Sequence, residues 1–262
     1  MKTVTRLITI TALLAGTFFA SSTLACSSAQ WTSTAAGATV GDPTGSVPRV
    51  KGFCGLEVTD TGHVVDNSPT AETTFIGRFY VYPNQLGAGT HEVFAAYSDE
   101  AGTKLFSITY DGTNFNFDAT AAAGGGSTSA AADTTHWNLV EFKWESDAQG
   151  SVWVNADALT EAATSTFASG TGSVDQVRLG AVASIDANTA FFDDYESHRS
   201  QAVGALLAGD GNDDGNINSG DVDMVVAEFL FSTLAGGVPD CNLDGNVNSG
   251  DIDCIVAIFL GL

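Results

Sequence analysis

The sequence predicts a mainly β protein, in which an antiparallel β-sandwich is followed by a small helical module. Residues 27 to about 200 contain many short runs of alternating apolar and polar residues, separated by turn residues such as Asp111-Gly112. This pattern is typical of antiparallel sandwiches. The last 53 residues contain one twelve-residue segment twice, and apolar residues at helical spacing follow each copy.

The expected strands cover residues 74–82, 91–97, 104–110, 114–117, 137–144, 151–155, 175–180 and 190–195. Side chains alternate between the two faces of a strand. In the run 137–144, Val140, Phe142 and Trp144 should therefore point into the core. About 170 residues are enough to enclose one sizeable core.

The acids between these core positions do not match a catalytic pair. Glu141 and Glu145 would stand about 13 Å apart on a straight strand. Paired carboxylates of glycosidases are separated by roughly 5 to 9.5 Å. We therefore interpret Glu141, Lys143 and Glu145 as a charged row facing solvent, and we assign no catalytic residue.

A second group of acids occurs at Asp193, Asp194 and Glu196. These residues have three interpretations: catalytic carboxylates, an additional calcium site, or the end of a strand with acids on alternating faces. The strand end is the favoured interpretation because it needs no further assumption.

The best candidates for sugar binding are Arg78, Tyr80 and Tyr82, which alternate onto one face of the strand 74–82. Aromatic rings stack on the apolar faces of sugars, and an arginine can donate hydrogen bonds to hydroxyl groups or to acidic sugars. Alternatively, this row belongs to one of the packed faces of the sandwich.

The repeated segment of the tail has the ligand spacing of a calcium loop. Asp210–Asp221 returns 30 residues later as Asp240–Asp251. Each copy has side-chain oxygens at positions 1, 3, 5, 9 and 12, and position 7 would bind the ion through its backbone carbonyl. A glycine at position 6 permits the sharp turn. We therefore predict two bound calcium ions. The ligand sets are Asp210, Asn212, Asp214, Asn216, Asn218 and Asp221 for the first ion, and Asp240, Asn242, Asp244, Asn246, Asn248 and Asp251 for the second.

Each loop should open an amphipathic helix of about three turns. The apolar positions are Val222, Val225, Val226, Phe229 and Leu230 after the first loop, and Ile252, Ile255, Val256, Phe259 and Leu260 after the second. Neither helix is long enough to be stable alone, so the two apolar faces should pack together. Each unit is thus half of an EF-hand, a loop with its exiting helix.

This duplicated loop and helix resembles a type I dockerin, over residues of about 205 to 262. Dockerins are calcium-dependent modules that attach secreted polysaccharide-degrading proteins to cohesin receptors, so the resemblance implies a cohesin-like partner. The family usually contacts cohesin through a Ser-Thr pair before the last ligand; here those places hold Ser219-Gly220 and Ser249-Gly250. The alternative is a calcium-stapled terminal domain without a partner.

The order of signals in the preceding domain resembles the laminin-G or concanavalin-A-like jelly roll of lectins and some glycanases. The likeness extends from the strand 74–82 through 136–155 to 191–199. It implies a lectin-like sandwich that binds carbohydrate, although the fold alone does not decide the function.

The N-terminus has the pattern of a secretory signal peptide. Lys2 and Arg6 precede an apolar run and small residues, so we expect cleavage after Ala25 and secretion. Lipidation of Cys26 is the alternative, but Thr23 occupies the place of the usual leucine. We expect three segments: a signal peptide at 1–25, the sandwich at 26–200 and the calcium module at 201–262.

The mature chain would carry 31 acidic against 7 basic side chains, a net charge of −24. Such a chain is repelled by nucleic acids and by anionic membranes, so neither is an expected partner. Four cysteines in an exported protein allow two disulfides in three connectivities. The local solution joins Cys26 to Cys54 and Cys241 to Cys254.

These features together predict a secreted calcium-binding protein with a lectin-like domain, a non-catalytic component of extracellular polysaccharide processing. The alternative is an extracellular glycoside hydrolase or polysaccharide lyase that is attached through the same C-terminal module. A third possibility is self-assembly of the protein, with the short linker Ser200–Gly209 holding the two modules close together.

Overall fold

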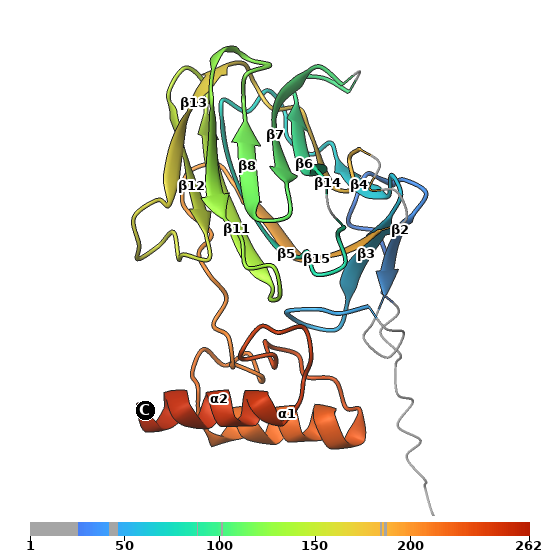
Figure 1. Ribbon diagram of the computed structural model, residues 1–262, viewed down its shortest axis with the longest axis vertical. Coiled ribbons are helices and arrows are strands. Elements are labelled where there is room, and N and C mark those ends of the chain that lie inside the picture. Colours follow the sequence, from blue (N-terminus) through green and yellow to red (C-terminus); the bar gives the residue numbers. More distant parts are fainter. Residues whose placement is uncertain (1–25, 42–46, 88, 101, 184, 186–187) are drawn as a thin grey trace, which may run out of the picture.

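The computed structural model describes residues 26–41, 47–87, 89–100, 102–183, 185 and 188–262. In these ranges the strands form two antiparallel sheets that pack face to face (Figure 1). The first sheet has the order β1 (Ser33–Thr34), β4 (His63–Asp66), β14 (Gln176–Gly180), β6 (His91–Tyr97), β7 (Lys104–Tyr110), β8 (Asn114–Asp118) and β10 (Ser127–Ala131). The second has the order β2 (Ala38–Gly41), β3 (Gly55–Thr59), β15 (Thr189–His198), β5 (Thr74–Tyr82), β11 (Asn138–Glu145), β12 (Gln149–Val154), β13 (Ser165–Thr171) and β9 (Ala123–Gly125).

The predicted fold class is confirmed: the protein is mainly β, with an antiparallel sandwich before two C-terminal helices. Strands β5, β6 and β7 have the bounds that alternation predicts. The prediction missed β1 to β4, β9, β10 and β13. Most of these are short or lie at the sheet edges. β10 consists of Ser, Thr and Ala, and β13 adds only Gly and one Phe, so both carry little apolar alternation.

Aromatic rings between the two sheets form the centre of the core. Phe142 of β11 lies 5.0 Å from Phe94 and 5.3 Å from Phe106, measured between ring centroids, and all three are buried. Trp144 is also buried, and its indole nitrogen donates a hydrogen bond of 2.8 Å to the carbonyl oxygen of Ser169. The expected inward face of this strand is confirmed.

Two helices, α1 (Ser219–Phe231) and α2 (Ser249–Leu260), follow the repeated loops as predicted. Their N-caps are Asn218 and Asn248, and each forms a capping box with the aspartate three residues later. Such caps satisfy amide groups that a helix start leaves free.

The two helices pack together as expected, but only part of each apolar face takes part in the contact. Val225 and Ile255 are fully buried against Cys241, and Ile217 and Val247 pack on this cluster. The C-terminal halves of both helices expose large side chains instead: Phe229, Leu230, Phe231, Ile258, Phe259 and Leu260.

The helical module lies at one end of the sandwich, with its loops between the helices and the sheets (Figure 1). The disulfides Cys26–Cys54 and Cys241–Cys254 are both present, which is the local pairing. Among the described residues, no helix combines the length and apolar character needed to cross a bilayer. The expected signal peptide lies outside the described residues.

Candidate functional site

The first and last aspartates of each repeated loop hold the loop backbone in place. Asp210 accepts hydrogen bonds from the amides of Asp214 and Gly215 at 3.0 and 2.8 Å. Asp221 accepts from the amides of Asn212 and Asn218 at 3.2 and 2.8 Å. The second loop repeats this pattern for Asp240 and Asp251, with distances between 2.8 and 3.3 Å.

The glycine at position 6 is required for the turn in both loops. Gly215 and Gly245 have φ angles of 82° and 88°, in the left-handed region that side chains with a Cβ avoid. At position 12, the side chains of Asp221 and Asp251 also accept the hydrogen bond from the backbone of the helix N-cap. The same residue therefore belongs to the loop and to the first turn of the helix.

Several acidic side chains are buried in this module, and residues 201–262 contain no lysine or arginine that could neutralise them. Asp221 and Asp251 are fully buried, and Asp210 and Asp240 are nearly so. Burial raises the pKa of Asp240 to about 8 against the amide hydrogen bond from Gly245, and the carboxylates of Asp251 and Asp244 raise it further. Burial also raises the pKa of Asp251. A cation would offset this repulsion.

The donors of the loops fit calcium better than a softer metal. Each loop offers three carboxylates, amide oxygens and a backbone carbonyl, which are the hard oxygen ligands that calcium prefers. In the described part of the chain, no group of three or more His, Cys, Asp or Glu side chains is arranged to hold a metal ion by itself. Two of the five side-chain oxygens in each loop come from asparagine, so the loops do not rely on carboxylates alone.

Residues 208–260 match the family model of the dockerin type I domain. The C-terminal module is a type I dockerin. Dockerin type I domains bind calcium. A search of the curated proteins found no match to the chain.

The solved structures similar to this chain include β-sandwich binding domains. The cellulose induced protein Cip1 is 15% identical, over 64% of this chain and 88% of that chain, with a TM-score of 0.48. The receptor binding domain of botulinum neurotoxin type G is 7% identical, over 65% of this chain and 43% of that chain, with a TM-score of 0.44. The binding domain of Paraclostridial Mosquitocidal Protein 1 is 6% identical, over 64% and 43%, with a TM-score of 0.45. The chain thus spans less than half the length of the neurotoxin domain, and likenesses at this level carry no argument about function.

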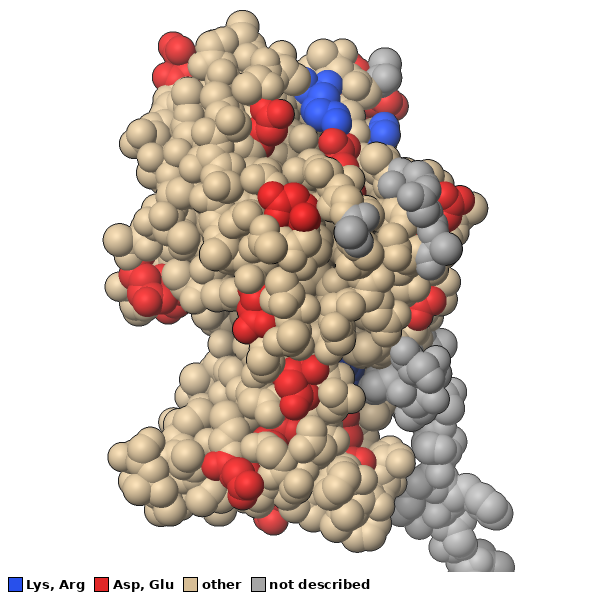
Figure 2. All heavy atoms as spheres, in the orientation of Figure 1, with Lys and Arg blue, Asp and Glu red and all other residues tan. Residues whose placement is uncertain are grey.

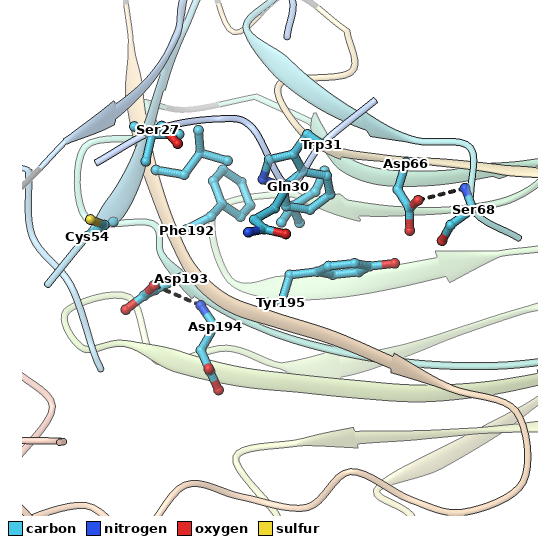
Figure 3. A pocket seen from close by; sticks show the side chains of 14 residues that line it. Ser27, Gln30, Trp31, Cys54, Asp66, Ser68, Phe192, Asp193, Asp194 and Tyr195 are labelled. Atoms are coloured by element: carbon cyan, nitrogen blue, oxygen red, sulfur yellow. Dashed lines mark hydrogen bonds between the residues drawn. The ribbon is translucent and has the colours of Figure 1, made fainter. Parts of the chain in front are cut away.

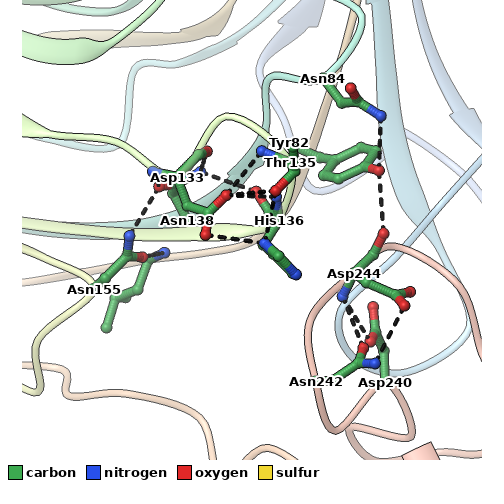
Figure 4. Close-up of polar contacts among 11 residues, drawn as sticks. Tyr82, Asn84, Asp133, Thr135, His136, Asn138, Asn155, Asp240, Asn242 and Asp244 are labelled. Atoms are coloured by element: carbon green, nitrogen blue, oxygen red, sulfur yellow. Dashed lines mark hydrogen bonds and ion pairs between the residues drawn. The ribbon is translucent and has the colours of Figure 1, made fainter. Parts of the chain in front are cut away.

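The second loop of the dockerin contacts the sandwich directly. The hydroxyl of Tyr82 donates a hydrogen bond of 3.1 Å to the carbonyl of Asp244, and Asn84 donates to the same hydroxyl at 3.0 Å (Figure 4). The amide of Trp137 donates to the carbonyl of Leu243 at 2.8 Å. The rings of Tyr82 and Trp137 lie 5.5 Å apart in an apolar cluster that also includes Leu243.

The predicted sugar-binding row therefore lies at this junction and not on an open face. Arg78, Tyr80 and Tyr82 are all buried, with exposures of 4%, 2% and 8%. The guanidinium of Arg78 donates to the carbonyl of Gly204 at 2.7 Å, and the hydroxyl of Tyr80 accepts from the amide of Leu206 at 2.9 Å. This burial departs from the expected sugar-binding surface and fits the alternative of a packed row, although the linker and the dockerin, and not the other sheet, cover it.

Glu141 also differs from its predicted role. It is fully buried, and its carboxylate accepts hydrogen bonds from the amides of Val203 and Gly204 at 2.8 and 2.9 Å. Lys143 and Glu145 do face solvent in part and form an ion pair of 2.6 Å. The charged row is therefore solvent-facing at only two of its three positions, and Glu141 instead fixes the linker.

Two ion pairs connect the dockerin to the segment before β3, and no sequence pattern predicted either of them. Arg49 pairs with Glu228 of α1 at 2.8 Å, and both side chains are buried. Lys51 pairs with Asp213, at position 4 of the first loop, at 2.9 Å in a partly exposed setting. On the face in Figure 2, acidic side chains are scattered over both parts of the molecule, while basic ones are few.

A concave pocket of about 410 Å³ opens on the sandwich between the N-terminal segment and β15 (Figure 3). Trp31 and Tyr195 contribute aromatic rings whose centroids lie 5.1 Å apart. Gln30, Asp66 and Asp193 add polar groups to the lining. Rings beside a few hydrogen-bonding groups are typical of small-molecule sites.

The acids 193–196 are engaged in local contacts. One oxygen of Asp193 accepts from the amides of Val50 and Lys51 at 2.7 and 2.9 Å. Asp194 and Glu196 both contact Arg78. A register shift of β15 against β5 between residues 193 and 196 places them there. This arrangement departs from a regular strand end with acids on alternating faces.

We expect Asp193 to make the stability of the protein depend on pH. Desolvation raises the pKa of Asp193 to about 7 from 3.8, against three backbone amide hydrogen bonds that lower it. Between these two pH values the folded state keeps a proton that the unfolded state has lost, so the free energy of unfolding should fall as the pH rises from about 4 to about 7. Urea unfolding at pH 5 and pH 8, in saturating calcium, should show a smaller fall for Asp193→Asn than for the wild type. Equal falls would contradict this assignment.

Proposed function

We propose that this is a secreted, calcium-binding, dockerin-bearing protein that attaches to a cohesin-like receptor and binds carbohydrate through its sandwich. It would act as a non-catalytic component of extracellular polysaccharide processing. The observation that carries the proposal is the pair of oxygen-rich loops with buried, uncompensated carboxylates in a dockerin type I match. The two disulfides and the expected cleavage after Ala25 support secretion.

The calcium sites of this proposal are the two ligand sets of the repeated loops. Isothermal titration of the mature chain 26–262 with calcium should show two ions bound. Within each loop, the side chains at positions 1, 3, 5, 9 and 12 and the carbonyl of Asn216 or Asn246 would hold the ion. Binding of fewer than two ions would contradict the assignment of one ion to each loop.

A protein partner is supported by the apolar surface on the C-terminal halves of the helices. Phe229 and Phe259 are 47% and 55% exposed, and they occupy equivalent positions of the repeat. Contiguous exposed apolar side chains mark interaction sites. A panel of cohesin modules, tested with the mature chain in calcium and in EGTA, would check the partner. Binding that needs calcium supports the proposal, and no binding to any cohesin favours the partnerless alternative.

We propose the pocket beside β15 as the carbohydrate site. Trp31 is partly exposed and lines this pocket, so a sugar could stack on its ring while the amide of Gln30 donates and the carboxylate of Asp66 accepts hydrogen bonds. Trp31→Ala should weaken glycan binding up to about tenfold, since aromatic contacts are worth about 0.5–1.5 kcal/mol. A glycan array identifies the ligand, and titration of both variants measures the loss. Trp153→Ala, on the outer side of β12, is the matched control.

The alternative function is an extracellular glycoside hydrolase or polysaccharide lyase. Asp193 favours it as the one acid of the pocket with a pKa raised to about 7, which suits a general acid or base. Reducing-sugar assays and absorbance assays for unsaturated products would decide between the two functions. Turnover that is lost in Asp193→Asn supports the enzyme, and saturable binding without products supports the binding protein.

A further inference from the structure

Three consecutive residues of the second calcium loop touch the sandwich. The carbonyls of Leu243 and Asp244 accept hydrogen bonds from the amide of Trp137 and the hydroxyl of Tyr82, at 2.8 and 3.1 Å. At Gly245, an added Cβ would lie only 3.0 Å from the ring of Tyr82, so the loop backbone packs directly on that ring. These contacts are made by positions 4, 5 and 6 of the loop.

The same positions lie between the ligands of the predicted metal site. Asn242 and Asp244 stand at positions 3 and 5, and Asn246 follows at position 7. Leu243 has a φ angle of 59°, in the left-handed region that residues with a Cβ adopt at a cost. Ligation of one ion by the residues on either side would hold Leu243 in this conformation, and this conformation presents its carbonyl to the sandwich.

We propose that the second calcium loop is a metal-dependent latch, which docks the dockerin on Tyr82 and Trp137 of the sandwich only when the loop holds its ion. This inference rests on the proposed calcium site of the second loop. The latch covers rings that would otherwise face solvent, and it fixes the orientation of the dockerin relative to the sandwich.

The first loop contributes less to docking. Its position 4 is Asp213, also in the left-handed region with a φ angle of 60°, and this residue pairs with Lys51. Both side chains of that pair are partly exposed, and exposed ion pairs add little to the stability of a contact. The Arg49–Glu228 pair and the linker contacts lie outside both loops, so they remain when the second loop alone loses its ion.

Amide exchange of Trp137, followed by NMR on the mature chain, tests the latch. In EGTA the Trp137 amide should exchange about tenfold faster or more than in calcium, because one buried hydrogen bond is lost. The amides of residues 140–144 lie in β11, which begins one residue after Trp137, and this strand pairs within the sheet, so their exchange should not change.

Two matched ligand variants separate the loops. Asp244→Ala removes the position-5 carboxylate of the second loop but keeps the carbonyl that Tyr82 contacts. It should give fast Trp137 exchange even in calcium. Asp214→Ala removes the equivalent carboxylate of the first loop and should leave Trp137 protected. Equal effects of the two variants on Trp137 would overturn the assignment of the latch to the second loop.

Coupling of two equilibria must be reciprocal. Tyr82→Phe removes one latch hydrogen bond and should weaken calcium binding at one of the two sites by about two- to tenfold. Tyr110→Phe, at another buried tyrosine of the sandwich, should leave both affinities unchanged. If titration shows calcium in the second loop but Trp137 is equally protected with and without it, the latch is wrong and the proposed function stands. If no calcium enters that loop, both fail.

Discussion

Removal of calcium is expected to unfold most of the dockerin while the sandwich stays folded. An ion that binds only the folded state stabilises it by about 2.7–4.1 kcal/mol when its concentration is 100 to 1,000 times the dissociation constant. Chelation also leaves four nearly buried aspartates without a compensating cation. The helical circular dichroism of α1 and α2 should therefore be lost in EGTA and return with calcium.

The matched variants for this experiment lie on the same helix. Asp251→Asn removes the position-12 carboxylate and one half of a capping box, so it should lower the melting temperature of the dockerin even in calcium. Asp253→Asn changes an exposed acid two residues later and should have an effect within about 0.5 kcal/mol. Identical melting of the wild type in calcium and in EGTA would contradict a structural role for the metal.

Local patterns predicted the parts of the structure that local interactions decide. Alternation located β5, β6 and β7, since each has one face in the core. The loop repeat located the ligand sets and helix starts, because ligand spacing and capping both act within twelve residues. The two disulfides also follow from proximity along the chain, because each joins a cysteine to its nearest neighbour in the sequence.

The contacts between the sandwich and the dockerin could not be predicted in this way. Alternation correctly separates Tyr80 and Tyr82 from the core face of β5, but it cannot show that a segment more than 120 residues later covers them. Glu141 is a similar case, because its partners are amides of the linker and backbone amides carry no sequence signal. At Tyr80 and Tyr82 of β5 and at Glu141 of β11, the outer face of the strand is therefore buried as well, although it was expected to be open.

For the helices the prediction was wrong in the opposite direction, since side chains that were expected to be buried are exposed. Apolar spacing predicts that Phe229 and Phe259 join the buried stripe, yet they are among the exposed side chains. The buried contact is confined to the first turns, around Val225 and Ile255, where the loops and the disulfide Cys241–Cys254 lie. A periodic pattern indicates an apolar face, but it does not tell whether the chain itself or a partner covers that face.

Replacement of Arg78 distinguishes the observed junction from the sugar-binding role that its sequence context suggests. Its guanidinium contacts Asp194, lies 3.3 Å from Glu196 and donates to the carbonyl of Gly204 at 2.7 Å. Arg78→Ala would leave these groups without their cation and donor. Loss of one partner of a buried ion pair costs about 3–5 kcal/mol, and the partly exposed side of Asp194 and Glu196 places the expected loss at the lower end.

Urea unfolding of the mature chain in saturating calcium measures this loss. Arg78→Lys keeps the charge without the planar fork of donors, so it should fall between the wild type and the alanine variant. Arg178→Ala is the control: this arginine is partly exposed and lies over the ring of Tyr97, at 4.4 Å from its centroid, a contact worth about 0.5–1 kcal/mol. If Arg78→Ala keeps full stability but loses glycan binding, then β5 does reach a sugar, and the junction seen here must open for it to do so.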